Sequence, residues 1–263
     1  MTAALGGLTA VEMATGIVIG DGADPGPLPA VPAGETPLAA LERACLPALR
    51  RGRCCVSFSG GRDSSIVLAA ATRVARREGL PLPLPVTNRF PHAGPTDESD
   101  WQELVVRHLG LDDWLRIDHT DALDIVGPVA RQVLARHGLL WPFNAHFHVP
   151  LLEAAEGGTL LTGIGGDELF GTSRWARAAS VLCLRESPRP RDLARIALLA
   201  SPRPLRRVAI ARRFPKDLFP WLTARARREL VGAWATDEAS EPISTPTRIR
   251  KLRGRRWAGW RRP

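Results

Sequence analysis

The fold of this chain is decided by the stretch Val56-Ser57-Phe58-Ser59-Gly60-Gly61-Arg62-Asp63-Ser64-Ser65. Its apolar beginning predicts a short strand over Cys54–Phe58. The glycine pair allows backbone angles that other residues avoid, which predicts a tight loop over Ser59–Asp63. A helix is expected to follow with Ser64 or Ser65 as its N-cap, because a serine hydroxyl can accept hydrogen bonds from free helix amides.

A glycine-rich turn between a strand and a helix indicates a phosphate-binding site. Such a turn directs free backbone N–H groups and the positive end of the helix dipole toward one point. The turn is not a Walker A motif, because no Gly-Lys-Ser/Thr follows and no lysine is near.

A second glycine-rich loop lies about 100 residues further along the chain, and it reads Thr162-Gly163-Ile164-Gly165-Gly166-Asp167-Glu168-Leu169-Phe170-Gly171. It follows an apolar segment, Thr159–Leu161, which is expected to be a buried strand. Parallel sheets bind ligands at the carboxyl ends of their strands, so we expect the two loops to meet at one edge of a sheet.

The first loop resembles the pyrophosphate loop Ser-Gly-Gly-x-Asp-Ser-Ser of the N-type ATP pyrophosphatases. That family includes asparagine synthetase, β-lactam synthetase, GMP and NAD synthetases and tRNA-thiolating enzymes. The second loop resembles the Ser-Gly-x-Gly-x-Asp-Glu-Leu/Val-Phe-Gly loop of the asparagine synthetase branch. The resemblance implies a ligase in which a carboxylate attacks the α-phosphorus of ATP, pyrophosphate leaves, and the acyl-adenylate reacts with an amine.

The resemblance also implies the cofactors ATP and Mg²⁺ and a set of site residues. The implied catalytic residues are Asp63, Asp167 and Glu168, and the implied magnesium ligands are Asp63 and Asp167. The implied ATP-binding residues are Ser59, Gly60, Gly61, Asp63, Ser64, Ser65, Val86, Thr87, Gly165 and Gly166, of which Val86 and Thr87 on the second strand are assigned to adenine. The amides of the first loop and the hydroxyls of its last two serines are expected to cradle the β and γ phosphates.

Three departures from the family pattern affect the expected substrate. Ile164 stands where asparagine synthetases usually carry a glutamate that can contact the activated aspartyl group, so asparagine as the product is in doubt. No N-terminal glutaminase domain is recognisable, so the amine is expected from a separate amidotransferase or another ammonia source. The family's C-terminal Pro-Phe-Leu-Asp-like segment and its lysine are not recognisable either. The chain is therefore expected to stop inside the synthetase domain, with a small-molecule or peptide carboxylate as substrate.

The expected fold is α/β, a parallel sheet wrapped by helices like the adenine nucleotide alpha hydrolases and the Rossmann-like proteins, followed by a helical C-terminal part. Residues 1–36 are expected to be a leader or linker, residues 37–171 the ATP pyrophosphatase core, and residues 172–263 the helical, Arg-rich part. The other expected strands lie at 84–87 and 113–117. The expected helices span 37–50, 64–77, 97–109, 120–137 with a break near Gly127-Pro128, and 144–156.

Periodicity also predicts which side chains face the core. Two helices are expected to bury one face each, formed by Ile66, Val67, Ala70 and Val74 and by Trp101, Leu104, Val105 and Leu109. Trp101 and Trp114 are expected in the core. The acids Asp97, Glu98 and Asp100 are expected to offset a helix dipole, or alternatively to line the substrate pocket. His146 and His148 cannot share a helix face and are expected to be packing or surface residues rather than metal ligands.

The net charge of +9 is concentrated at the C-terminus and does not by itself predict a nucleic-acid partner. Eight basic residues and no acids lie between Pro246 and Pro263, together with Trp257 and Trp260. This pattern occurs in some RNA-binding segments, but a basic helix that packs against sequence absent from this chain is the favoured interpretation. Two alternative functions stay open: a tRNA-modifying pyrophosphatase, and a non-catalytic remnant that binds nucleotide.

Compartment and membrane association follow from simpler features. The chain has no run of 18 apolar residues and no secretory signal, so no membrane partner is expected. Its four cysteines lack metal-ligand spacing, and a reduced cytoplasm is the expected compartment.

Overall fold

The computed structural model describes residues 8–19, 30, 32–92, 98–140, 142–166 and 176–240. The chain divides into two compact units. An α/β unit comprises Ala30–Arg136 and Asn144–Glu168, and a helical unit comprises Met1–Pro29, His137–Phe143 and Leu169–Pro263. The predicted three-part division of the chain stays a prediction.

The α/β unit is built on a four-stranded parallel sheet with the strand order β3-β2-β1-β4. Its strands are β1 (Cys54–Ser57), β2 (Leu84–Arg89), β3 (Leu115–Asp118) and β4 (Thr159–Leu161). The chain runs outward from β1 through β2 to β3 and then returns to the other side of β1 as β4. Because the strand order reverses between β1 and β4, a topological switch point lies at the carboxyl ends of these two strands. Open parallel sheets bind ligands at such a point.

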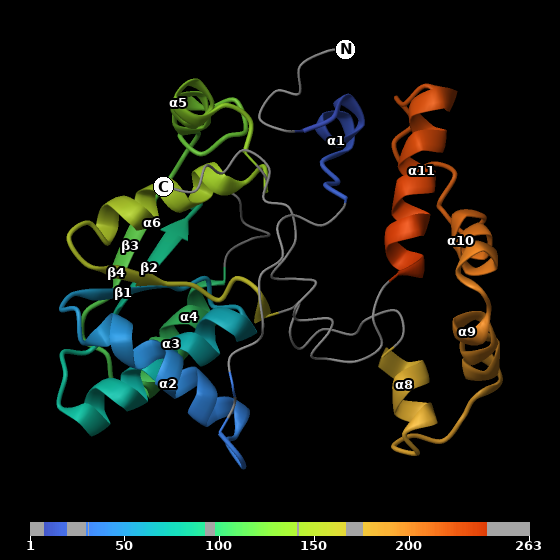
Figure 1. The fold of residues 1–263 in the computed structure, drawn as a ribbon. Coiled ribbons are helices and arrows are strands. Elements are labelled where there is room, and N and C mark those ends of the chain that lie inside the picture. The colour runs from blue at the N-terminus through green and yellow to red at the C-terminus, as the bar shows by residue number, and fades with distance from the viewer. Residues whose placement is uncertain are drawn as a thin grey trace. The chain divides into compact units, whose positions relative to one another are not determined.

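Helices cover both faces of the sheet, as Figure 1 shows, with α2 (Pro37–Leu49), α3 (Arg62–Glu78) and α4 (Ser99–His108) on one side and α6 (Val149–Ala154) on the other. Helices α2 and α3 pack side by side (Figure 1) and form the main packing layer on their face of the sheet. Side chains alternate along β1, because successive residues of a strand point to opposite faces. Cys54, Val56 and Phe58 enter the core under α3, whereas Cys55 enters the core under α6. The predicted α/β class is confirmed.

Helix α3 begins at Arg62 with Gly61 as its N-cap, so the prediction that Ser64 or Ser65 caps it is wrong. The Ser64 hydroxyl lies within the first turn and donates to the Gly61 carbonyl at 3.0 Å, which is a contact inside the helix rather than a cap. Val67, Ala70 and Val74 are buried as predicted, but Ile66 is 50% exposed.

Helix α4 buries a different face from the one predicted. Trp101 and Leu104 are 55% and 52% exposed, whereas Gln102 and Val106 are buried. The buried face of α4 is shifted by about one residue from the predicted one, because the Gln102 side-chain amide donates a hydrogen bond to the Ser59 carbonyl. Trp114 is half-buried, and its indole N–H donates to the Thr87 hydroxyl at 2.9 Å.

Two further predicted helices are shorter than expected. The helix predicted over 120–137 starts only at Pro128, as α5 (Pro128–His137), because turns occupy the residues before the proline. The helix predicted over 144–156 divides into the 3₁₀ turn η3 (Ala145–His148) and α6. Asn144 precedes η3 but makes no side-chain capping bond.

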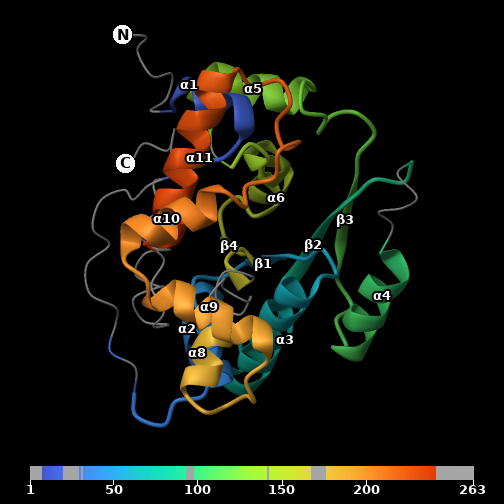
Figure 2. The same cartoon turned by 90° about the vertical axis from the view of Figure 1, so that its right-hand side faces the viewer.

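The described part of the helical unit contains α1 (Ala10–Thr15), α8 (Ala176–Leu182), α9 (Pro190–Ala200), α10 (Arg203–Ala211) and α11 (Ala224–Ala239). Figure 1 and Figure 2 both show α10 beside α11. Helices α8 to α11 share a small core that consists of Ala178, Leu199, Ile210, Ala235 and Ala239. The predicted proline breaks at 188–190 and 202–204 separate α8, α9 and α10. The third break, at 242–246, and the basic tail lie outside the described residues. Among the described helices none is long and apolar enough to cross a membrane.

The packing of α3 yields a test of the α/β core. Leu68 is fully buried, so Leu68→Ala should lower the free energy of unfolding by about 2–5 kcal/mol, since it removes contacts and leaves a cavity. Ile66→Ala is the matched control on the same helix and should stay within about 0.5 kcal/mol. Urea denaturation followed by circular dichroism measures both, and equal losses would contradict the placement of Ile66 at the surface.

Candidate functional site

The loop after β1 presents main-chain amides at the N-terminus of a long helix. Gly60 has a φ of +88°, a left-handed conformation that favours glycine, and it turns the chain sharply from β1 into α3. No side chain caps α3, so the amides of its first turn are free of a capping partner. Uncapped amides at the positive end of a 17-residue helix form a site for an anion such as phosphate.

Serine hydroxyls hold this loop in shape. The Ser64 hydroxyl accepts from the Ser59 amide at 3.2 Å and lies 3.1 Å from the Ser59 hydroxyl. The Ser65 hydroxyl donates to the Gly60 carbonyl at 3.3 Å. The two hydroxyls that the sequence associates with phosphates therefore make contacts inside the loop.

The second glycine-rich loop follows β4 and packs directly on the first. A Cβ atom at Gly163 would lie 2.7 Å from the Ser64 amide nitrogen, and one at Gly166 would lie 2.3 Å from the carboxyl carbon of Asp63. At Gly163 the neighbours are main-chain atoms that cannot move aside, so only glycine fits there, whereas at Gly166 a larger residue would have to displace the Asp63 side chain. Gly165, with a φ of +97°, turns the chain between them. The two motifs are therefore in contact at Asp63, as the prediction of a common sheet edge requires.

The other acidic residues of the second motif, Asp167 and Glu168, lie outside the described residues. Among the residues that the structure does describe, no group of three or more His, Cys, Asp or Glu side chains could hold a metal ion. The described side-chain oxygen atoms that could act as metal ligands near the loop contact are the Asp63 carboxylate and the hydroxyls of Ser57, Ser59, Ser64 and Thr162. Carboxylate and hydroxyl oxygens are hard donors, the kind that Mg²⁺ prefers.

A hollow of about 480 Å³ opens at the contact of the two loops, and its lining includes Ser57, Ser59, Gly61, Arg62, Asp63, Ser64, His148, Thr162, Gly163 and Ile164. Ile164 is 61% exposed, so its aliphatic side chain stands free at the rim. His148 is half-buried, and desolvation lowers the pKa of its imidazole, which keeps the ring neutral at pH 7.

Sequence reasoning assigned His148 to packing or to the surface and missed its place in this lining. Its position depends on how η3 approaches the sheet edge, and local periodicity carries no signal for that. The neighbouring His146 is a packing residue as predicted, since it is buried and its Nε2 lies 2.9 Å from the Leu123 carbonyl oxygen.

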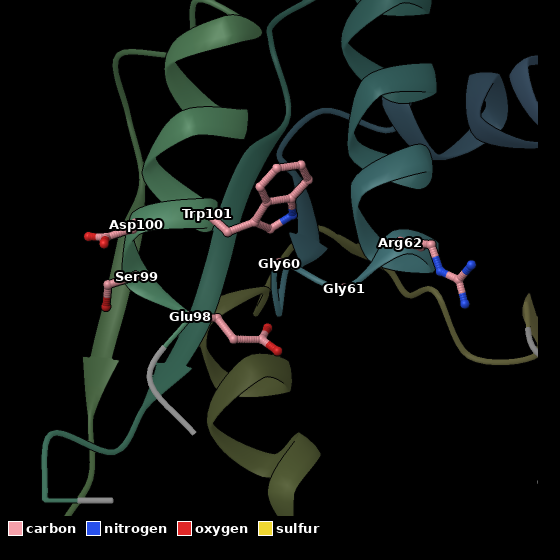
Figure 3. Close-up of a pocket in the computed structure, with 7 residues that line it drawn as sticks. All are labelled: Gly60, Gly61, Arg62, Glu98, Ser99, Asp100 and Trp101. Atoms are coloured by element: carbon pink, nitrogen blue, oxygen red, sulfur yellow. The ribbon is translucent and has the colours of Figure 1, made fainter. Parts of the chain in front are cut away.

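A second hollow of about 560 Å³ shares Gly61 and Arg62 with the first, and its lining is Gly60, Gly61, Arg62, Glu98, Ser99, Asp100 and Trp101. Figure 3 shows Glu98 and Trp101 turned toward the glycines, whereas Ser99 and Asp100 point away. Glu98 precedes α4 without making a side-chain capping bond. The position of Glu98 favours the alternative interpretation as a pocket residue, whereas Asp100 lies in the first turn of α4, where an acid offsets the helix dipole. Asp97 lies outside the described residues.

Val86 and Thr87 lie apart from both hollows. They are 0% and 1% exposed, and β2 is hydrogen-bonded on both sides by β1 and β3. The Thr87 hydroxyl is occupied by the Phe58 carbonyl and the Trp114 indole. Their adenine-binding role stays a prediction, and the side chains of both residues are committed to the core.

Comparison with known proteins matches the chain to one family. The family model described as asparagine synthase matches residues 40–261, a range that includes both glycine-rich loops and the sheet that brings them together. No curated protein matches the chain. Since the matched range covers most of the sequence, the chain belongs to the asparagine synthase family.

Proposed function

We propose that this protein activates a substrate carboxylate as an acyl-adenylate, releases pyrophosphate from ATP, and transfers the acyl group to an amine. Family membership supports an ATP-dependent, amide-forming ligase in general. The observation that carries the finer proposal is the contact between the two loops at Asp63, next to uncapped helix amides at the switch point of the sheet.

The Gly60 amide and the uncapped amides at the start of α3 would bind the β and γ phosphates, since the Ser59 and Gly61 amides are already hydrogen-bonded within the loop. Dipoles held in place need no reorganisation when charge develops beside them. Asp63 would hold Mg²⁺, since its carboxylate lies at the loop contact among hydroxyl donors. Asp167 and Glu168 are proposed as the second metal ligand and a catalytic residue. A bound Mg²⁺ would supply positive charge to the phosphates during displacement of pyrophosphate.

The lining of the hollow bears on the substrate. Ile164 lines the hollow and is 61% exposed, and it stands where the family usually has a glutamate that can contact the activated aspartyl group. We therefore propose a carboxylate without a free α-ammonium group, in a small molecule or a peptide, rather than free aspartate. The amine would come from a separate ammonia source or amidotransferase, in a tailoring amidation related to asparagine biosynthesis.

The cysteines argue against the alternative of tRNA thiolation. Sulfur transfer needs an accessible thiolate, but Cys45, Cys54 and Cys55 are all buried. Desolvation raises the pKa of Cys45 to about 11 and also raises the pKa of Cys54. Cys183 is exposed, but it is a single accessible thiol rather than a pair, since the other three of the four cysteines are buried.

Removing the Asp63 charge should weaken the binding of Mg-ATP. Asp63→Asn keeps the size of the side chain, and we expect at least roughly tenfold weaker binding in Mg²⁺, since a contact with a charged group is worth about 1.5–3 kcal/mol. Isothermal titration with and without Mg²⁺ measures the effect. Asp113→Asn, at an exposed position outside the site, is the control. Equal Mg²⁺-dependent affinity in both variants would remove Asp63 from the site.

Alanine at Gly166 and alanine at Gly163 should affect Mg-ATP binding and stability differently. Alanine at 166 meets only the mobile end of Asp63, so Gly166→Ala should displace that carboxylate and weaken Mg-ATP binding with little change in melting temperature. Alanine at 163 meets main-chain atoms, so Gly163→Ala should lower the affinity and also the melting temperature, because overpacking costs about 1–3 kcal/mol. Gly232→Ala, with open space around it, is the control. Unchanged affinity in both loop variants would argue against the loop contact.

The nature of the products tests the reaction class. We expect the enzyme to release pyrophosphate rather than phosphate when a carboxylate substrate is present. N-acetylaspartate should be a better substrate than aspartate. Hydroxylamine should trap the activated acyl group as a hydroxamate. Ile164→Glu should make the rates with aspartate and N-acetylaspartate more similar, because the new carboxylate can pair with the ammonium group of aspartate. Rapid aspartate-dependent pyrophosphate release by the wild type would instead point to plain asparagine synthesis.

A further inference from the structure

We propose that Gln102 is the positioning residue that sets the orientation of the Ser59–Gly60 peptide, and thereby the direction of the Gly60 amide, in the phosphate-binding loop. The inference rests on the proposed function above and extends it to a residue outside both motifs. The Gln102 amide group donates from Nε2 to the Ser59 carbonyl oxygen at 2.8 Å, across 43 residues of sequence.

The contact is tight and shielded from water. Gln102 is 7% exposed, and a Cβ atom at Gly60 would lie 2.7 Å from its Cγ atom. The side chain is thus packed against the one residue of the loop that adopts a left-handed conformation. Glu98, which precedes α4, and Trp101, in its first turn, line the hollow beside the glycine pair and turn their side chains toward the glycines (Figure 3).

The geometry of a peptide unit explains why this one hydrogen bond matters. A trans peptide is planar, so the N–H of Gly60 points opposite to the C=O of Ser59. With the carbonyl held toward α4, the Gly60 amide faces away from that helix. Within the described part of the chain, this amide donates no hydrogen bond.

Glycine on one side of a peptide makes rotation of that peptide easy, because both signs of φ are open to it. Rotation of the Ser59–Gly60 unit would replace a donor by a carbonyl oxygen, which repels phosphate. A fixed partner for the Ser59 carbonyl prevents this exchange. Neighbouring contacts already fix the adjacent amides, since the Ser59 amide donates to Ser64 and the Gly61 amide donates to the Ser59 hydroxyl at 3.3 Å.

Core packing alone does not account for a glutamine at this place. Its Oε1 atom is buried and has no hydrogen-bond partner among the described residues. An unpaired buried acceptor is unfavourable, so an apolar side chain of the same length would serve the packing better. The hydrogen bond from the Gln102 carboxamide to the Ser59 carbonyl therefore explains the glutamine better than packing does.

The test compares Mg-ATP with AMP, because only ATP carries the β and γ phosphates that the loop is proposed to bind. Gln102→Met keeps the length of the side chain and removes the donor. We expect it to bind Mg-ATP about tenfold more weakly, since a contact between an amide and a charged phosphate is lost, with AMP affinity unchanged. Gln132→Met makes the same change at an exposed position of α5 and should bind both nucleotides as the wild type does.

A second variant separates positioning from bulk. Gln102→Glu places an acceptor against the Ser59 carbonyl at neutral pH, and its carboxyl can donate only when protonated. Burial raises the pKa of such a group above its usual value of about 4.3. The Mg-ATP affinity of Gln102→Glu, taken relative to wild type at each pH, should therefore recover as the pH falls from 8 toward 5. A side chain with a packing role alone gives no such recovery.

The outcomes are distinct. If the wild type binds Mg-ATP no more tightly than AMP, the proposed phosphate site fails and this inference fails with it. If the wild type discriminates but Gln102→Met discriminates equally well, only the positioning role of Gln102 is overturned. Loss of AMP and Mg-ATP binding together, or a pH-independent deficit in Gln102→Glu, would also overturn that role and assign the residue to packing.

Discussion

The close approach of Gly163 and Gly166 to Asp63 and Ser64 is the constraint on which the rest of the site depends. A Cβ atom at 163 would lie 2.7 Å from the Ser64 main chain, and one at 166 would lie 2.3 Å from the Asp63 carboxyl group, so a larger residue would clash with the main chain at 163 and displace the carboxylate at 166. The approach is possible because β4 pairs with β1 in parallel register, which brings the ends of both strands to the same height. The position of a carboxylate in the first motif is thus set partly by the absence of side chains in the second.

The polar groups around this contact have two roles: some hold the loop in shape, and others are left free for a ligand. Hydroxyls and one carboxamide, from Ser59, Ser64, Ser65 and Gln102, make contacts inside the protein that hold the loop. Main-chain amides at the start of α3 are left without a cap. Binding by preset amides suits a highly charged ligand, because rigid dipoles stabilise charge without having to reorient.

The sequence predicted the parallel sheet, the four strands and the meeting of the two loops, because glycine spacing and apolar runs report directly on local backbone geometry. It failed where tertiary contacts override local periodicity. Helix α4 buries Gln102 rather than Trp101, since the amide of Gln102 has a main-chain partner 43 residues away that no local pattern reveals. Ile66 follows the helical period but reaches the surface. His148 lines a hollow because η3 approaches the glycine loop in space, which no local pattern reveals. For Glu98 the sequence left capping and pocket lining open, and the structure favours pocket lining.

The pairing of β1 with β4 also has a consequence for how the protein is made. Cys54 pairs with Thr159, so β1 keeps one unpaired edge until more than a hundred further residues have been synthesised. Pairing over so long a sequence separation is slow, because the loop entropy is lost before the contacts form. An apolar strand with a free edge is open to pairing with other chains meanwhile. The nascent chain should therefore be most prone to aggregate on the ribosome before Thr159–Leu161 emerge, and slower translation ahead of β4 should lengthen that period.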